Sequence, residues 1–378
     1  MKAISGGQGF PLKQNSKFDT RYDLGMQNRT MRIGDAVVSD DSDCYVIAEL
    51  GHNHQGDIEV AKKMIFAAAN AGVNAVKLQK RNNKQLFTKS YYEKPYTSEN
   101  SYGATYGEHR EYLEFGRSEY LELQKYSESL GVDFFATAFD FSSADFLAEL
   151  NVPAIKIASG DLTNIPLLKY VAAIGKPVIV STGGGTIEDV DRAVNCFSNS
   201  NVDFCVMQCT AGYPPTWEEL NLRVIETFRS RYPEIVVGFS SHDNGIAMGL
   251  VGFILGARVI EKHFTLNRAS KGTDHAFSLE PPGMQKLVRD LRRARISLGD
   301  GQKTQFPSER EPLTKMGKKL VFARDFAAGH KLTRDDIAIK SPGGGLMPFV
   351  IESVIGKTVL KSVKCDDDIS LSDLGESK

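Results

Sequence analysis

Short apolar runs alternate with amphipathic segments from residue 44 to residue 298 of the chain. The runs are almost continuously hydrophobic, and this is typical of parallel strands that are buried on both faces. Eight runs follow one another: Cys44–Leu50, Ala75–Gln79, Phe134–Ala138, Ala154–Ala158, Pro177–Ser181, Phe204–Cys209, Ile235–Phe239 and Arg258–His263. The pattern predicts an α/β protein built on eight parallel strands.

The segments between the runs have the period of helices. Clear examples are 57–71, 118–130, 143–150 and 188–196, and the segment 280–297 supplies the last helix. Eight strand–helix units over about 250 residues fit a closed (β/α)8 TIM barrel better than an open sheet. The sequence therefore predicts a TIM barrel.

The amino-acid composition of the chain changes before and after the barrel pattern, and these changes divide the chain into four predicted regions. They are an irregular N-terminal lead-in (1–40), the barrel (41–299), a polar linker with Pro307 and Pro312 (300–317) and a small β-rich domain (318–378). The last region contains short apolar runs separated by Gly and Pro. A domain of this size is marginally stable alone, so we expect it to dock on the barrel or on a second subunit.

One connection in the barrel pattern is unusually long. Residues 81–116 follow the second strand and are rich in Tyr, Ser, Asn and Gly. A loop this long in a compact domain is usually functional or disordered. Because it leaves the rim formed by the carboxyl ends of the strands, we expect it to form a lid or a wall over a site.

Bulk composition excludes some classes of partner. The 46 Lys and Arg residues balance 47 Asp and Glu residues, which argues against binding to nucleic acid or to a membrane surface. We find no signal-peptide pattern and no apolar run near the roughly 18 residues of a membrane span. The five cysteines lack metal-ligand spacing, and the pattern predicts a reducing, cytoplasmic location.

Two histidines stand at the ends of the last two predicted strands. His242 and His263 would lie side by side on the rim where barrel active sites form, and together they predict a divalent-metal site. A single histidine at a strand end is more often structural, but two on adjacent strands favour a metal. His52 and His54 follow the first strand and are either ligands or ordinary loop residues.

Two lysines interrupt otherwise apolar strands. Lys77 and Lys156 could be Schiff-base nucleophiles, anion receptors or partners in structural ion pairs. Three serines at nearby strand ends favour a cradle for a phosphorylated, carboxylated ligand: Ser159, Ser181 and Ser240. Glu49 at the end of the first strand either orients water as a base or neutralises a strand lysine.

Several of these segments resemble the sialic acid synthases. The segments are Ile47–Gly56, Lys156–Asp161, Ser181–Gly183, Gln208–Pro214, Gly238–His242 and Glu261–Thr265. The resemblance extends over residues 31–374, and the final 60 or so residues resemble the antifreeze-like (SAF) domain of that family. The segments Pro95–Ser98, Thr105–Arg110 and Lys271–His275 are most similar to the branch with the animal-type 9-phosphate synthases.

The resemblance implies a transferase, a synthase that condenses phosphoenolpyruvate with an N-acylated hexosamine and releases phosphate. By motif, His242 and His263 would bind Mn2+ or Mg2+, and Glu49 would handle water or a proton near C2 of the enol. Phosphoenolpyruvate would contact Lys77, Lys156, Ser159, Ser181 and Ser240. The sugar would contact Gln79, Asp161, Tyr213 and Asp274. A homodimer is also implied.

Three positions depart from the pattern of the bacterial free-sugar enzymes. Ala211 replaces an Asn and removes one potential hydrogen bond to phosphoenolpyruvate, and Ser241 replaces the Asp before His242. Ser341 replaces an Arg of the C-terminal domain that reaches the partner's sugar. The cross-subunit contact is therefore absent, or it falls to Lys340 with a different geometry.

Three alternatives stay open at this point. The acceptor is N-acetylmannosamine, its 6-phosphate or another N-acylated hexose that would yield a related nonulosonic acid, and we identify no extra basic cluster at the rim for a second phosphate. A Schiff-base aldolase using Lys77 or Lys156 is a second enzyme class. A sugar-binding module without catalysis is the third, but the dense polar rim argues against it.

Overall fold

The structure is a computed structural model, and it describes residues 29–376. The chain divides into two compact units, one ending at Leu298 and the other beginning at Gly299. We call them the barrel unit and the C-terminal unit and describe each by itself. Among the described residues, we find no helix with the combined length and apolar character that a bilayer crossing requires.

The barrel unit is a closed barrel of eight parallel strands, which confirms the predicted fold class. The strands are β3 (Tyr45–Glu49), β4 (Ala75–Lys80), β5 (Asp133–Ala138), β6 (Ile155–Ile157), β7 (Val178–Ser181), β8 (Phe204–Cys209), β9 (Val236–Ser241) and β10 (Val259–His263). Each strand pairs with the next, and β10 pairs with β3 to close the barrel. The register of that closure aligns His263 with Glu49.

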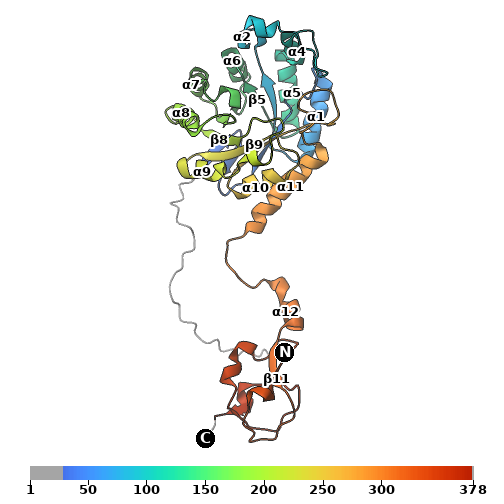
Figure 1. The fold of residues 1–378 in the computed structure, drawn as a ribbon, viewed down its shortest axis with the longest axis vertical. Coiled ribbons are helices and arrows are strands. Elements are labelled where there is room, and N and C mark those ends of the chain that lie inside the picture. The colour runs from blue at the N-terminus through green and yellow to red at the C-terminus, as the bar shows by residue number, and fades with distance from the viewer. Residues whose placement is uncertain (1–28, 377–378) are drawn as a thin grey trace. The chain divides into compact units, whose positions relative to one another are not determined.

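Seven helices connect successive barrel strands, an eighth follows β10, and together they cover the outer surface of the barrel (Figure 1). They are α1 (Ile58–Ala71), α5 (Arg117–Ser129), α6 (Phe141–Glu149), α7 (Ile165–Ile174), α8 (Ile187–Ser198), α9 (Val224–Arg231), α10 (Ala247–Ile254) and α11 (Pro281–Leu298). Every residue of β3 and of β7 to β10 is buried, because side chains fill the barrel on the inside and helices cover it on the outside. This double burial explains the nearly continuous apolar runs of the sequence.

A β-hairpin precedes the barrel. Strands β1 (Thr30–Ile33) and β2 (Ala36–Ser39) pair antiparallel around a turn in which Gly34 has a positive φ of 54°. The prediction of an irregular lead-in up to residue 40 was therefore wrong for this segment. Met31, Ile33 and Val38 are buried in the main core, so the hairpin is held by packing. The rest of the predicted lead-in, residues 1–28, lies outside the described residues.

The long connection after β4 has its own structure. It contains α2 (Asn83–Leu86), α3 (Lys89–Tyr92) and α4 (Tyr106–Leu113). A capping box fixes the start of α4: the Thr105 hydroxyl accepts from the Glu108 backbone N–H, and the Glu108 carboxylate accepts from the Thr105 N–H. Aromatic contacts then join α4 to α3, with the rings of Tyr91 and Tyr106 4.8 Å apart.

The C-terminal unit is a small β-rich fold with two two-stranded sheets. Its elements are η3 (Pro307–Glu309), α12 (Arg310–Met316), β11 (Lys319–Phe322), η4 (Arg334–Asp336), β12 (Ile337–Lys340), η5 (Pro348–Ser353), β13 (Thr358–Val359), η6 (Leu371–Asp373) and β14 (Leu374–Gly375). A separate apolar core includes Leu320, Phe322, Leu332 and Val354. The predicted linker, residues 300–317, is not entirely irregular because it contains η3 and α12.

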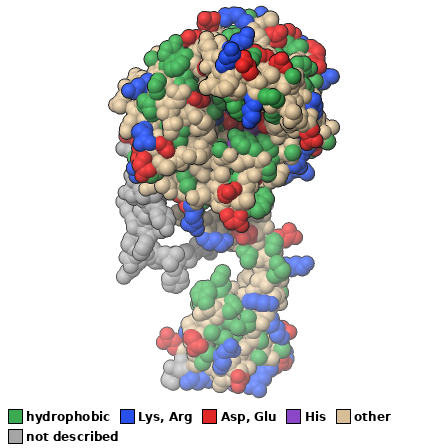
Figure 2. All heavy atoms as spheres, turned by 45° about the horizontal axis from the view of Figure 1, so that its top comes forward, with side chains coloured by type: hydrophobic (Ala, Val, Ile, Leu, Met, Phe, Trp, Pro, Cys, Tyr) green, Lys and Arg blue, Asp and Glu red, His purple; other side chains and the backbone are tan. Residues whose placement is uncertain are grey.

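The surface carries charges of both signs. Figure 2 shows basic and acidic side chains intermixed over the visible face, in line with the formal net charge of −1. Each of the five cysteines is a free thiol, and four of them are buried. A cytoplasmic location stays a prediction.

Candidate active site

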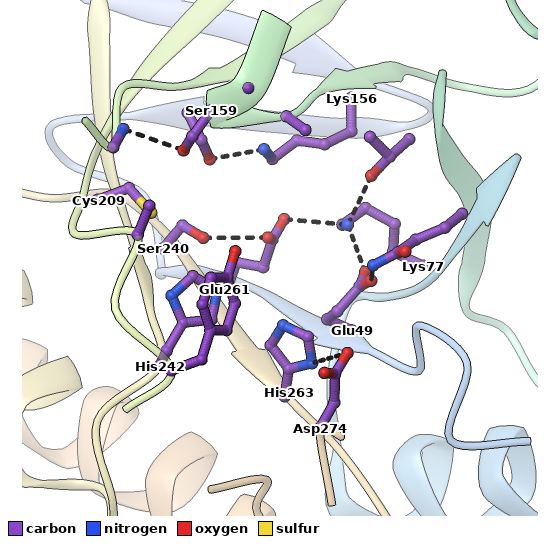
Figure 3. Close-up of a pocket in the computed structure, with 18 of the residues that line it drawn as sticks. Glu49, Lys77, Lys156, Ser159, Cys209, Ser240, His242, Glu261, His263 and Asp274 are labelled. Carbon is purple, nitrogen blue, oxygen red and sulfur yellow. Dashed lines mark hydrogen bonds and ion pairs between the residues drawn. The ribbon is translucent and has the colours of Figure 1, made fainter. Parts of the chain in front are cut away.

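A cavity of about 660 Å3 opens at the carboxyl ends of the barrel strands. Eleven of the predicted site residues line it: Glu49, Lys77, Gln79, Lys156, Ser159, Ser181, Tyr213, Ser240, His242, His263 and Asp274. Figure 3 labels eight of them, all except Gln79, Ser181 and Tyr213. They come from different strands and loops, and barrel closure brings their side chains together. The twelfth, Asp161, does not line the cavity. Its carboxylate accepts a hydrogen bond from Asn164, so its contact with a sugar stays a prediction.

A buried network of charges lies around Lys77, which is only 3% exposed. Its ammonium forms an ion pair with Glu49, donates a 2.9 Å hydrogen bond to Thr137 and lies 3.7 Å from a carboxylate oxygen of Glu261 (Figure 3). Gln79 donates to the second oxygen of Glu49 at 2.7 Å. One ammonium therefore faces two carboxylates from two adjacent strands.

The two carboxylates differ in proton affinity. Burial raises the pKa of Glu49 to about 7, although Lys77 opposes this rise. Burial would also raise the pKa of Glu261, but Lys77 and Lys156 outweigh it and hold that pKa below its usual value. Two neighbouring acids with separated pKa values are typical of sites that transfer protons. Glu49 is thus suited to hold or release a proton near neutral pH.

A second set of hydrogen-bonded polar side chains lies around Lys156. Its ammonium donates to Ser181 Oγ at 2.6 Å and to the Ile157 carbonyl at 2.8 Å. Ser159 Oγ accepts from the Gly183 N–H at 2.9 Å, and Ser240 donates to Glu261 at 3.1 Å. Lysine and serine donors converge on one wall of the cavity, where they suit an anionic ligand.

The two histidines lie close together at the end of β9 and β10. Their ring centroids are 5.2 Å apart, and the His242 Nδ1–H donates to the Thr210 carbonyl at 3.1 Å, which leaves Nε2 unprotonated. Burial lowers the pKa of His242 to about 3 and also lowers the pKa of His263. Both rings are therefore neutral at pH 7, the form that binds metals.

This pair fits a divalent metal with an incomplete set of protein ligands. His263 Nδ1 is buried without a hydrogen-bond partner, and the nearest carboxylate oxygen, from Asp274, is 3.7 Å away. Within residues 29–376 we find no group of three or more His, Cys, Asp or Glu side chains arranged for a metal. Two imidazoles would leave the remaining positions to water and substrate, as in open catalytic sites.

Comparison with known proteins identifies the family. The NeuB family model matches residues 64–303, and a SAF domain model matches residues 319–375. The human N-acetylneuraminate-9-phosphate synthase is 40% identical over 327 residues, which cover 86% of this chain and 91% of the relative. The chain belongs to the NeuB family. This membership confirms the resemblance described above.

Other relatives of this NeuB-family enzyme act in related syntheses by name. An N,N'-diacetyllegionaminic acid synthase from Legionella pneumophila is 34% identical over 83% of this chain and 89% of the relative. The crystal structure of an N-acetylneuraminic acid synthetase from Leptospira borgpetersenii, in complex with citrate, is 33% identical. It matches with a TM-score of 0.67 over 75% of this chain and 95% of the other.

The structure also reveals cavity residues that sequence reasoning missed. Arg81 and Arg110 line the outer part of the cavity together with His52, so the conclusion that the rim has no further basic cluster was wrong. The sequence did contain a signal for Arg81. Lys77, Gln79 and Arg81 are spaced two residues apart along one strand and its extension, so their side chains point to the same face. The signal for Arg110 was less specific: the residue belongs to the long connection predicted to form a lid or a wall and to the segment Thr105–Arg110, but only the fold of that connection brings α4 to the cavity.

His54 is a structural residue. It is 2% exposed, stacks on Phe115 with ring centroids 4.1 Å apart and accepts from the Gly56 N–H at 3.1 Å. Of the two histidines after β3, only His52 lines the cavity.

A buried ion pair connects the two segments that carry the histidines. Lys262, between Glu261 and His263, donates to the Asp243 carboxylate at 2.9 Å and to the Asp243 carbonyl at 2.6 Å. Both side chains are 1% exposed. The pair joins the residue after His242 to the residue before His263, and we infer that it fixes the spacing of the two imidazoles.

We expect Asp243→Asn to lower the free energy of unfolding by about 3 to 5 kcal/mol, because it leaves the Lys262 ammonium buried without a counter-charge. The double variant Asp243→Leu with Lys262→Met should recover much of that loss. Urea unfolding of the full chain measures both. In contrast, Glu149→Gln removes the exposed partner of Arg117 and should cost at most about 1 kcal/mol. Equal effects at the two sites would contradict the structural role.

Proposed function

We propose that this NeuB-family enzyme condenses phosphoenolpyruvate with an N-acylated hexosamine, releases phosphate and forms a nonulosonic acid. The observation that carries the proposal is the single cavity in which a two-lysine anion cradle adjoins two neutral histidines. The names of the relatives, synthases of N-acetylneuraminate 9-phosphate and of diacetyllegionaminic acid, support the same reaction class.

The donor substrate binds at the lysine wall. Lys77 and Lys156 offset the charge of the phosphate and carboxylate, and Ser159, Ser181 and Ser240 supply neutral hydrogen bonds. Both lysines are at most 3% exposed, and their attraction for an anion is stronger there than in water. Ala211 also lines the cavity and offers no side-chain hydrogen bond to this substrate.

The acceptor binds at the histidine end. His242 and His263 would hold Mn2+ or Mg2+ through their unprotonated nitrogens, and a bound divalent ion supplies Lewis-acid polarisation of the aldehyde oxygen. The Tyr213 ring lies tilted against His242, with ring centroids 4.1 Å apart, and Gln79 and Asp274 line the same cavity. These residues would orient the sugar so that its aldehyde carbon faces the enol.

The chemistry then follows from the residues around the enol. C3 of phosphoenolpyruvate forms a carbon–carbon bond with the aldehyde carbon, and C2 gains cationic character. Glu49 takes a proton from a water molecule that adds at C2, a step suited to its pKa of about 7. The aldehyde oxygen takes the electron pair of its broken π bond and one proton of that water, and becomes a hydroxyl. The tetrahedral centre at C2 then breaks its bond to the phosphate oxygen, its hydroxyl proton passes to the departing phosphate, and a ketone is left. Lys77 and Lys156 hold the departing phosphate.

A Schiff-base aldolase is not favoured. A lysine nucleophile must be free to attack a carbonyl, but Lys77 is held by an ion pair with Glu49 and a hydrogen bond to Thr137, and Lys156 donates to Ser181 and to the Ile157 carbonyl. The relatives are named as synthases. An acceptor with a different N-acyl pattern remains within the proposal, because the family includes diacetylated products.

A homodimer is part of the proposal, in which the C-terminal unit covers a second subunit. We infer that its cross-subunit contact does not use Ser341 or Lys340 in the place of an arginine. Ser341 accepts from Lys318 at 2.7 Å, and Lys340 forms an ion pair with Asp366, so both are engaged within their own unit. We therefore expect acceptor binding to depend on the barrel cavity.

Turnover with phosphoenolpyruvate and each candidate acceptor tests the proposal directly. We expect phosphate release that requires both substrates, a product with the mass of the acceptor plus a pyruvate unit, and loss of activity in EDTA with recovery in Mn2+ or Mg2+. Phosphate release and product mass are measured in the same reaction. Activity with pyruvate in place of phosphoenolpyruvate, trapped by borohydride on a lysine, would establish the aldolase instead.

Metal binding tests the histidine pair separately from turnover. His242→Ala and His263→Ala should each weaken Mn2+ binding by at least about tenfold, because each removes one of two protein ligands. Titration calorimetry without substrates measures this, and circular dichroism verifies folding. His330→Gln, in the C-terminal unit, is the control and should leave the affinity unchanged. Wild-type affinity in both alanine variants would rule out this metal site.

A further inference from the structure

A cluster of basic side chains at the outer part of the cavity has no role in the reaction described so far. It consists of Arg81, just after β4, Arg110 from α4, and His52 between their guanidinium groups. Arg81 lies 3.2 Å from His52 Nε2, and Arg110 lies 3.2 Å from His52 Nδ1. We call these three residues the arginine cluster.

The arginine cluster has more hydrogen-bond donors than acceptors. A neutral imidazole carries one N–H and one unprotonated nitrogen, so His52 can accept from only one of the two guanidiniums. Burial and the charges of Arg81 and Arg110 hold the pKa of His52 well below its usual value, so the ring is neutral. One arginine N–H therefore faces an N–H of His52 and needs another acceptor.

The cluster is also short of negative charge. Arg81 has Glu114 at 3.8 Å, but Lys80 lies closer to that carboxylate, at 3.3 Å. Within residues 29–376, Arg110 has no carboxylate oxygen within 4 Å. Burial and the nearby Arg110 lower the pKa of Arg81 to about 10, so Arg81 stays protonated at neutral pH. Two partly buried like charges are costly unless an anion binds between them.

The arginine side chains are held in position to bind such an anion. The Arg81 guanidinium stacks on the Phe139 ring at 3.8 Å and donates to Gln79 at 2.6 Å. Arg110 donates twice to the Tyr106 hydroxyl, at 3.0 and 2.8 Å. A fixed planar guanidinium binds phosphate through two parallel hydrogen bonds, and this makes arginine more selective than lysine for such groups.

Asp274 connects this cluster to the histidine pair. Its carboxylate is 3.7 Å from His263 Nδ1, and its charge acts on both His52 and Arg110. An acceptor whose aldehyde lies at the histidines would therefore extend past Asp274 toward the arginines. We propose that Arg81 and Arg110 bind a phosphate on the far carbon, C6, of the acceptor. The product then carries this phosphate on C9, because phosphoenolpyruvate adds three carbons at the other end.

This inference rests on the proposed function and specifies its acceptor. N-acetylneuraminate-9-phosphate synthases from human, mouse and Drosophila melanogaster are 39 to 40% identical to this chain. Their names agree with a phosphorylated product, but the argument itself depends on the unpaired donors and uncompensated charge of the cluster.

The decisive comparison uses wild-type enzyme with N-acetylmannosamine and with its 6-phosphate, at saturating phosphoenolpyruvate. We expect kcat/KM to favour the phosphorylated acceptor by at least about 100-fold. Equal use of the two acceptors would overturn the phosphate site and leave the condensation intact. If neither acceptor, nor any other N-acylated hexose, reacts with phosphoenolpyruvate, the proposed function itself fails.

Variants of the two arginines test whether the arginine cluster causes the preference for the phosphorylated acceptor. Arg81→Met and Arg110→Met should each lower the ratio of kcat/KM for phosphorylated over free acceptor by about 10- to 100-fold, the range for a lost charged hydrogen bond. Arg117→Met is the matched control, because Arg117 pairs with Glu149 at the surface and lies outside the cavity. It should leave the ratio unchanged.

A second pair of variants keeps the test valid if the methionine variants fail to fold. Arg81→Lys and Arg110→Lys keep the charge but remove the planar pair of donors, so each should lower the ratio by a smaller factor than methionine does. Circular dichroism identifies any variant that does not fold. Folded methionine or lysine variants with the wild-type ratio would overturn the assignment, whatever the preference of the wild-type enzyme.

Discussion

The buried ammonium of Lys77 is the group on which the rest of the site depends. It bonds to Glu49 of β3 and Thr137 of β5 and faces Glu261 of β10, so it links strands on both sides of β4. Burying such charges costs several kcal/mol per ion, and their mutual attraction repays this only in part. A barrel core made only of apolar residues would avoid that cost. The arrangement is best explained by the charged ligand that it prepares the cavity to receive.

Charge is distributed unevenly along the cavity, and each part suits a different chemical group. At the lysine end, two carboxylates nearly compensate the charges of Lys77 and Lys156, and this balance would let a substrate anion bind and depart. In the middle, burial keeps the two histidines neutral, and the Asp243–Lys262 pair behind them holds their strands in register. At the outer end, the arginines exceed the nearby negative charge. These three parts of the cavity would take, in turn, phosphoenolpyruvate, the aldehyde of the acceptor and the distant phosphate of the acceptor.

Much of this arrangement was predictable because a parallel barrel couples sequence position to spatial position. A strand buried on both faces is an uninterrupted apolar run, and its last residues must lie on the rim, so His242, Lys156 and Ser181 were identified from the pattern alone. The hairpin at residues 30–39 was missed because its strands are short and sit among polar and glycine residues. Arg110 was missed, and Asp161 lies outside the cavity lining, for another reason: neither sits on a barrel strand, and the folding of a connection decides whether its side chains reach the cavity.

The central claim is that the enol carbon of a bound phosphoenolpyruvate attacks an aldehyde and that its C2–oxygen bond then breaks. Phosphoenolpyruvate labelled with 18O in the bridging oxygen tests this most directly, with the isotope followed by mass spectrometry of both products. We predict that the label leaves with inorganic phosphate, because water supplies the new oxygen at C2. Retention of the label in the sugar acid would show that the phosphorus–oxygen bond breaks instead, and it would contradict the role assigned to Glu49 and its water.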